Sequence, residues 1–184
     1  MFEVGERGVD AEIISIRIQM NSRKEKLCKE LERIEEDALY SMKGHYNASA
    51  RWRFWYLFFG IINVISSVFA GITSFSEVDC LIKVSTIIVA VVTGLSTFLE
   101  CSKKAENHRM SGNSFLKIKN RARFLKDIRA EVIEVNELET LLAELLDQKD
   151  ELNSASLPIP KFAYEKAKKE IKAGNATYQV DKKE

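Results

Sequence analysis

Proline and glycine are scarce in this chain. Two prolines, Pro158 and Pro160, and eight glycines occur among its 184 residues. Because these residue types are the main helix breakers, their scarcity favours long uninterrupted helices. Sustained alternation of apolar and polar residues is also lacking, so the pattern predicts an all-α chain. Ile14, Ile16 and Ile18 do alternate and leave a short strand open, although we expect helix there.

Cysteine and histidine are equally sparse. The three cysteines, Cys28, Cys80 and Cys101, have neither CxxC nor CxxxC spacing, and no histidine stands at metal-ligand spacing from them. We therefore expect three reduced thiols rather than a disulfide or a metal site. His45 and His108 are the only histidines, and no nucleophile elbow, phosphate loop, HExxH motif or paired-carboxylate pattern accompanies them. We expect no catalytic residue, no metal, no cofactor and no enzymatic activity.

An excess of charge of one sign is missing as well. The formal net charge is +1, whereas a nucleic-acid-binding domain carries a basic excess, so we expect no nucleic-acid partner. The first residues also lack a basic segment followed by an apolar run, which a secretory signal peptide would need. The first hydrophobic segment is therefore expected to act as its own insertion signal.

Uncharged apolar sequence is concentrated between Phe54 and Leu99. Residues 54–75 contain no charge, and residues 81–99 contain one, Lys83, near the start of the run. At about 1.5 Å per residue, each run is long enough for the roughly 30 Å of bilayer hydrocarbon. The pattern predicts a transmembrane hairpin over residues 51–100, with spans at about 54–76 and 81–99. Glu77 and Asp79 mark the short turn between them.

The flanks have the periodicity of amphipathic helices. Apolar residues recur every three or four positions in both flanks, at Leu27, Leu31, Ile34, Ala38, Met42 and Tyr46, and at Phe115, Ile118, Ala122, Leu125, Ile128, Val132, Val135, Leu138, Leu142 and Leu145. The expected fold is an all-α membrane protein, a two-span helical hairpin whose long cytoplasmic helices form a coiled-coil-like bundle with each other or with other copies. Outside the hairpin we expect a flexible N-terminus (1–9), two amphipathic helices (10–50 and 101–155), a proline-broken short helix (156–174) that stops at Gly174, and a tail (175–184).

Basic residues define the expected orientation. Arg51 and Arg53 precede the first span, and a dense Lys/Arg cluster follows the second, whereas the turn is acidic. By the positive-inside rule, both termini are cytoplasmic, and we expect a multi-pass protein of the cell inner membrane. We interpret the basic cluster after the second span as a signal that sets this topology. The alternative is that it recognises anionic lipid headgroups.

Each predicted span has one face of small or polar residues. This face indicates either helix packing or the lining of a pore, which two helices are too thin to enclose without other copies. A homo-oligomer is therefore expected. Asn63 stands out, because an amide at mid-span needs a hydrogen-bond partner. In an oligomer, Glu100 could form a ring of carboxylates at the cytoplasmic end of a pore. The candidate pore-lining or packing residues are Asn63, Ser66, Ser67, Thr73, Ser85, Thr86, Thr93, Ser96, Thr97 and Glu100.

Polar residues next to the predicted membrane form a second candidate group. His45 lies just before the first span and His108 just after the second, so we expect them to lie near each other. An interhelical hydrogen bond is the expectation, and a pH sensor or a ligand contact is the alternative. The candidate juxtamembrane regulatory residues are His45, Arg51, Lys103, Lys104, His108 and Arg109.

The order of these features resembles a known family. His45 and Ala50-Arg51 lead into a closely spaced hairpin, and residues 103–109, Lys-Lys-Ala-Glu-Asn-His-Arg, follow it. Phe115, Arg121, Arg123 and the proline-broken end with Phe162, Ala167 and Ile171 complete a pattern that covers roughly residues 10–175. This resembles the SLATT family, the two-transmembrane effector domains associated with SMODS and SLOG proteins.

The resemblance implies a function. Members are proposed to be membrane effectors of prokaryotic anti-phage defence, which form pores when a partner sensor or a nucleotide-generating enzyme triggers them. We expect no fused sensor domain here, so the trigger would act on the helices themselves or come from a partner chain. The alternative is a structural or adaptor protein, whose hairpin is only an anchor and whose cytoplasmic coil binds a partner.

Overall fold

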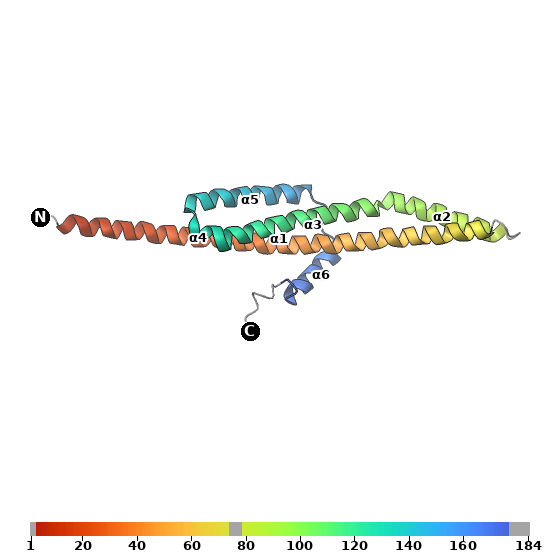
Figure 1. Cartoon of the computed structure of the whole chain (residues 1–184), viewed down its shortest axis with the longest axis horizontal. Coiled ribbons are helices and arrows are strands. Elements are labelled where there is room, and N and C mark those ends of the chain that lie inside the picture. Colours follow the sequence, from red (N-terminus) through yellow and green to blue (C-terminus); the bar gives the residue numbers. More distant parts are fainter. Residues whose placement is uncertain (1–2, 74–78, 177–184) are drawn as a thin grey trace. The chain divides into compact units, whose positions relative to one another are not determined.

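The computed structural model describes residues 3–73 and 79–176, which contain helices and no strand. In chain order the elements are α1 (Glu3–Thr73), α2 (Asp79–Leu99), α3 (Cys101–Phe124), the π-helical segment η1 (Leu125–Arg129), α4 (Ala130–Val132), α5 (Val135–Ala155) and α6 (Lys161–Lys172), all labelled in Figure 1 except η1. The described chain divides into two compact units. Unit 1 combines residues 3–42 with 113–155, and unit 2 combines 43–73, 79–112 and 156–176.

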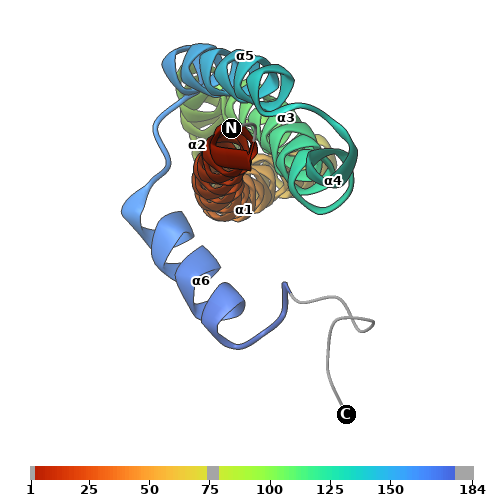
Figure 2. The ribbon, with the colours of Figure 1, turned by 90° about the vertical axis from the view of Figure 1, so that its left-hand side faces the viewer.

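Unit 1 is a bundle of three helices. In Figure 1, α5 runs beside the second half of α3, and Figure 2 gives the end-on view of α1, α3 and α5. The apolar stripes predicted from sequence form its core, since the following residues are buried: Leu31, Ile34, Ala38 and Met42 of α1, Phe115, Ile118 and Ala122 of α3, and Leu138, Leu142 and Leu145 of α5. Burial of these side chains is the main stabilising term of the bundle.

Charged residues join the helices of this bundle at its rim. Lys126 Nζ lies 2.8 Å from Glu35 Oε2, and Lys149 Nζ lies 2.6 Å from Asp37 Oδ2. Arg23 pairs with Glu139 as well. The pairs connect α1 to η1 and to α5, so they favour one alignment of the helices over others.

The π-helical segment corrects part of the predicted stripe. Ile128 and Val132 are exposed, Val132 to 81%, whereas Ala130 is buried. A π turn takes one residue more than an α turn, so the inward-facing position after Leu125 is Ala130 and not the expected Ile128. Periodicity at 3.6 residues per turn cannot anticipate such an insertion.

The structure also corrects the single helix predicted over 101–155. Ile133 is extended, with φ −92° and ψ 160°, and α5 starts at Val135 in a new direction. Val132, Ile133 and Val135 are β-branched, and such residues favour extended backbone. The Lys24 ammonium donates to the Ile133 carbonyl at 3.3 Å, which holds this reversal against α1.

Unit 2 contains the two most apolar helical stretches. Helix α1 and the helix beginning at α2 are long and apolar enough to cross a membrane, and almost none of their most apolar windows is buried by the rest of the chain. Helix α2 ends at Leu99, and Glu100 alone joins it to α3 with a positive φ of 46°. A left-handed backbone conformation is strained for a residue with a side chain. The break between α2 and α3 is therefore confined to Glu100.

Helix α6 lies between Pro160 and Gly174, within the segment 156–174 where the sequence predicts a short helix. Pro160 is its N-cap, and the Pro160 carbonyl accepts from the backbone N–H of Ala163 at 2.9 Å. At the other end Gly174 has φ 76°, which only glycine adopts readily. The Gly174 N–H donates to Ile171 and the Asn175 N–H to Glu170, a Schellman motif.

Helix boundaries differ from the expected ones at three places. Helix α1 starts at Glu3 and so includes residues 3–9, where the sequence predicts a flexible N-terminus, because isolated glycines weaken a helix without ending it. It continues without a break from the predicted helix 10–50 into the predicted first span. Asp79, expected in the turn, is the first residue of α2. Residues 74–78, which hold the rest of that turn, and 177–184 of the predicted tail lie outside the described residues.

Candidate functional site

A pair of histidines lies between α1 and the first part of α3 in unit 2. His45 Nδ1 and His108 Nδ1 are 2.9 Å apart, and each side chain is only 2% exposed. The two ring centroids are 5.2 Å apart with an interplanar angle of 44°. The expected proximity of these two residues is therefore confirmed, and the geometry is that of an interhelical hydrogen bond.

The bond between two Nδ1 atoms restricts the protonation states of the pair. One ring must carry its proton on Nδ1 and donate, while the other must keep Nδ1 as an acceptor. Burial lowers the pKa of His45 from 6.5 to about 4, and the positive charge that His108 can carry adds to this effect. Burial also lowers the pKa of His108. The pair is therefore neutral at pH 7, and it resists taking up protons at mildly acidic pH.

Small residues let the two helices approach closely around this pair. A Cβ atom at Gly112 would lie 2.8 Å from two ring carbons of Tyr46, so only glycine fits there without movement. One turn further along α1, the Ser49 hydroxyl donates to the Ala105 carbonyl at 2.7 Å. We name this contact the His-pair interface: His45, Tyr46 and Ser49 of α1 with Ala105, His108 and Gly112 of α3.

The other candidate regulatory residues lie apart from the pair on the surface of unit 2. Lys104 lies over the Trp52 ring, with Nζ 4.8 Å from the ring centroid. Lys103 lies 3.5 Å from Glu100, and Arg109 forms a two-pronged pair with Glu106 at 2.8 and 2.9 Å. Arg51 is exposed and stacks on Phe162 of α6. The predicted group is thus one buried pair and four surface cations with different partners.

The small polar residues of the apolar helices have internal hydrogen-bond partners. Hydroxyls donate to carbonyls three or four residues earlier, from Ser67 to Asn63, Ser85 and Thr86 to Ile82, Ser96 to Val92 and Thr97 to Thr93. The Thr93 hydroxyl lies 3.5 Å from the Asn63 amide oxygen, which joins α2 to α1. Asn63 of α1 thus has a side-chain contact on α2.

Burial divides these residues into two groups. Ser85 is buried, and Asn63, Ser66 and Ser96 are half-buried, as expected for packing positions. Ser67, Thr86, Thr93, Thr97 and Glu100 are exposed in a single chain. The side chain of Thr73 lies outside the described residues.

Large apolar side chains surround the remaining faces of the same helices and are exposed. They include Phe54, Leu57, Ile61, Val64, Val68 and Ile72 on α1, and Val84, Ile87, Val91, Leu95 and Phe98 on α2. Monomeric soluble proteins rarely expose contiguous apolar surface on this scale. The arrangement suits contact with lipid or with further copies of these helices.

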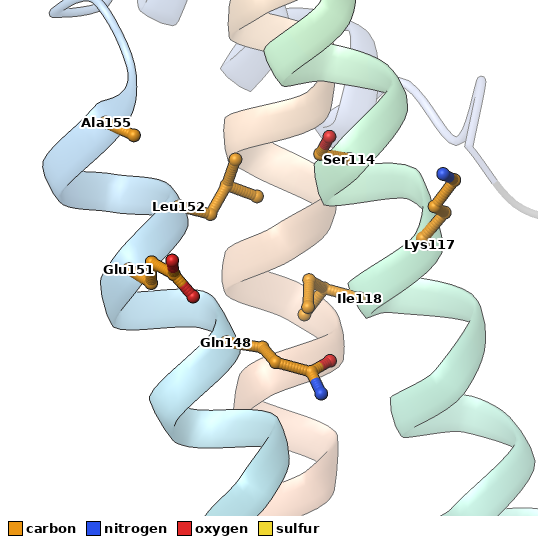
Figure 3. A pocket seen from close by; sticks show the side chains of 7 residues that line it. All are labelled: Ser114, Lys117, Ile118, Gln148, Glu151, Leu152 and Ala155. Carbon is orange, nitrogen blue, oxygen red and sulfur yellow. The ribbon is translucent and has the colours of Figure 1, made fainter.

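An open pocket of about 350 Å³ lies in unit 1 between α3 and α5. Figure 3 shows Ile118 of α3 and Leu152 of α5 reaching into the space between the helices, with Gln148 and Glu151 of α5 beside them and Lys117 on the other side of α3. Among the described residues, no three His, Cys, Asp or Glu side chains gather as metal ligands.

Sequence reasoning missed three contributors to this region. Gly112 and Ser49 set the helix approach, and a glycine within an otherwise helical pattern was the available signal for the first. Phe162 lies more than one hundred positions from Arg51 in the chain, and no local pattern predicts that contact.

Comparison with known proteins identifies no relative. No family model matches the chain, and no curated protein or solved structure matches it.

Proposed function

We propose that this chain is an integral membrane protein whose spans are the last part of α1 and α2, paired as an antiparallel hairpin. The supporting observation is the exposure of most of the large apolar side chains on these two stretches. A helix of comparable apolarity in a soluble core would be covered by other elements. Because water solvates such surface poorly, acyl chains are the environment that suits it.

The charge pattern supports one orientation for this hairpin. Arg51 and Arg53 lie at one end of the first span, and the basic residues of α3 follow the second. Trp52, Trp55 and Tyr56 occupy the level at which interfacial aromatic residues gather. We propose a multi-pass protein of the inner membrane with both termini, the bundle of unit 1 and α6 on the cytoplasmic side.

We further propose that several copies assemble into a regulated pore. Asn63, Ser66, Ser85 and Ser96, which are covered or half-covered, suit packing of α1 on α2. Ser67, Thr86 and Thr97 remain exposed in one copy, and they would face a water-filled lumen or a neighbouring copy. The resemblance to the SLATT family supports an effector of anti-phage defence, triggered by a partner sensor or a nucleotide signal.

Membrane potential tests this proposal directly. Expression of the chain with its trigger should depolarise bacterial cells and arrest their growth. Thr97→Val, which keeps shape and removes the hydroxyl, should change single-channel conductance in planar bilayers. The matched control Val64→Leu, on a bulky face, should leave it unchanged. Cells that stay polarised and grow normally under every condition would contradict the pore.

A second candidate function is that of an anchored adaptor. The pocket between α3 and α5 favours it, because Ile118 and Leu152 form an apolar floor with a mixed polar rim, the anatomy of a protein-binding surface. For an adaptor, a scrambled hairpin of equal hydrophobicity should retain function, and Thr97→Val should change nothing. For a pore, the scrambled hairpin should lose function.

A further inference from the structure

A second pocket, of about 450 Å³, lies in unit 2 between α1 and α6. Its α1 wall consists of Asn47, Ala50, Arg51, Phe54 and Trp55, which share one helix face, and its α6 wall consists of Phe162 and Lys166. Neither the proposed pore nor the His-pair interface uses this pocket.

Helix α6 is held against α1 by several contacts, so the pocket is formed in advance of any ligand. Ala163 and Ala167 are fully buried, and the Asn47 amide donates to the Ala163 carbonyl at 3.4 Å. Lys43 Nζ lies 3.5 Å from Glu170 Oε2, which ties the far end of α6 to α1.

The pocket has one cationic end. Arg51 and Lys166 are charged, and no acidic residue stands among the seven that line the pocket. The Arg51 guanidinium lies 4.6 Å from the centroid of the Phe162 ring, which orients it. The Lys166 ammonium lies 3.9 Å from the Glu170 carboxylate. The same carboxylate lies closer to Lys43, at 3.5 Å, so Lys43 shares its charge with Lys166. An anion in the pocket would therefore have two cationic donors, the Arg51 guanidinium held against Phe162 and the Lys166 ammonium.

The other end is aromatic and adjoins the proposed membrane. Phe54 is the first residue of the apolar run and follows Arg51 by three positions, about 4.5 Å along the helix. Phe162 and Tyr164 of α6 are exposed, and α6 carries five lysines and two glutamates. Exposed aromatic rings with a lysine-rich face are typical of helices that lie at the surface of an anionic bilayer.

We propose that this pocket binds the phosphate of an anionic phospholipid between Arg51 and Lys166, with the start of its acyl chains against Phe54 and Trp55. This inference rests on the membrane placement proposed above. A free phosphate would satisfy the cationic end equally well, but it would leave the aromatic end without a partner. Basic pockets at this level of membrane proteins bind lipid headgroups in this way.

Lipid binding to the full chain, purified in neutral detergent, tests the site. Dioleoyl phosphatidylglycerol and dioleoyl phosphatidylcholine are titrated separately, and bound lipid is counted by native mass spectrometry. We expect selective binding of phosphatidylglycerol, and an affinity about thirtyfold lower in the double variant R51Q/K166Q, which removes both cations. The control R53Q/K169Q removes the same charge from the same two helices outside the pocket, and we expect a change of less than about threefold.

Three results would overturn the site: equal losses in the two double variants, equal binding of the two lipids, or loss of binding in K166R, which keeps the charge. Helix content by circular dichroism verifies that each variant folds.

In a last experiment, inorganic phosphate is added at millimolar concentration. Binding of phosphate that is lost in R51Q/K166Q, together with equal binding of the two lipids, would identify a free phosphate as the ligand and overturn the lipid assignment. This assay measures lipid binding and no ion flux, so its result is independent of the pore. If the chain binds the lipid but a separate flux measurement finds no conductance, only the proposed pore is contradicted.

Discussion

Helix α1 takes part in two regions that differ in the exposure of their apolar side chains. In unit 1, Leu31 lies on a narrow stripe and is 0% exposed, whereas in unit 2 Val64 lies in an all-round apolar segment and is 65% exposed. Charged residues fill the other faces of α1 near Leu31, but none occurs between residues 54 and 73. A stripe can be buried by two neighbouring helices, but an all-round apolar surface cannot be covered by one. The comparison shows that the breadth of the apolar surface decides whether protein or lipid can solvate it.

The largest expected effect comes from the buried side of this comparison. Leu31→Ala should lower the free energy of unfolding by about 3 to 4 kcal/mol, because it leaves a cavity in the core of unit 1. Denaturant unfolding of the detergent-solubilised chain measures this. The control Lys29→Ala removes an exposed i,i+4 pair with Glu25 and should cost less than about 0.5 kcal/mol. Equal effects of the two variants would mean that the stripe is not a core.

A charge introduced on the exposed side distinguishes lipid from water. Val64→Lys should disfavour membrane insertion by about 3 kcal/mol, because a lysine at mid-span lies in hydrocarbon. The fraction of chain that resists carbonate extraction should fall sharply, whereas Val64→Leu should leave it unchanged. On a water-exposed surface the lysine would be tolerated. An unchanged membrane-bound fraction would therefore contradict the claim that lipid surrounds Val64.

The buried histidines extend the comparison to pH. The folded pKa of His45, about 4, lies below its ordinary value of 6.5, so the unfolded chain binds more protons between these values. Stability is therefore fully present above pH 6.5 and falls as the pH is lowered towards 4. From pH 7 to pH 5 we expect a loss of about 2 kcal/mol from His45, measured by thermal unfolding. His108, whose pKa is also lowered, contributes in the same direction.

The double variant His45→Gln/His108→Gln isolates this contribution. It lacks both titrating rings, so its stability should change much less over the same pH range. A slope as steep as that of the original chain would show that other groups carry the dependence.

The smallest expected effect concerns the helix approach at Gly112. Gly112→Ala places a Cβ atom 2.8 Å from the Tyr46 ring, and we expect a net destabilisation of about 1 kcal/mol after the gain in helix propensity. In a Tyr46→Ala background the clash is absent, so the same substitution should stabilise the chain by up to about 1 kcal/mol. Thermal unfolding of the four chains measures this reversal of sign, and its absence would mean that the ring moves aside freely.

Local sequence patterns predicted much of the fold. The stripe from Leu31 to Met42, the apolar runs, the proline before α6 and Gly174 after it each depend on neighbouring residues alone, and each is found where expected. The proximity of His45 and His108 followed from placing both next to paired apolar runs, and the structure confirms it.

Other features depend on contacts that no local pattern contains. A hydrogen bond from Lys24 of α1 holds the reversal at Ile133, and the π turn at 125–129 adds a residue to one turn. The periodicity of residues 101–155 contains neither feature and predicted one long helix. The contact of Arg51 with Phe162 requires the position of α6, which the sequence does not specify. The polar span residues were predicted as packing or lining positions, and Ser85 is the one that is buried among those whose side chains the structure describes.

The nature of the medium around Val64 tests the central claim most directly. A spin label is attached at position 64 in a chain whose native cysteines are alanine, reconstituted in bilayers, and a second sample carries the label at position 29, whose side chain is equally exposed. The account predicts rapid relaxation of the label at 64 by oxygen and little by a water-soluble nickel chelate, with the reverse at 29. Access of the nickel chelate to position 64, or protection of that position from both agents, would contradict it.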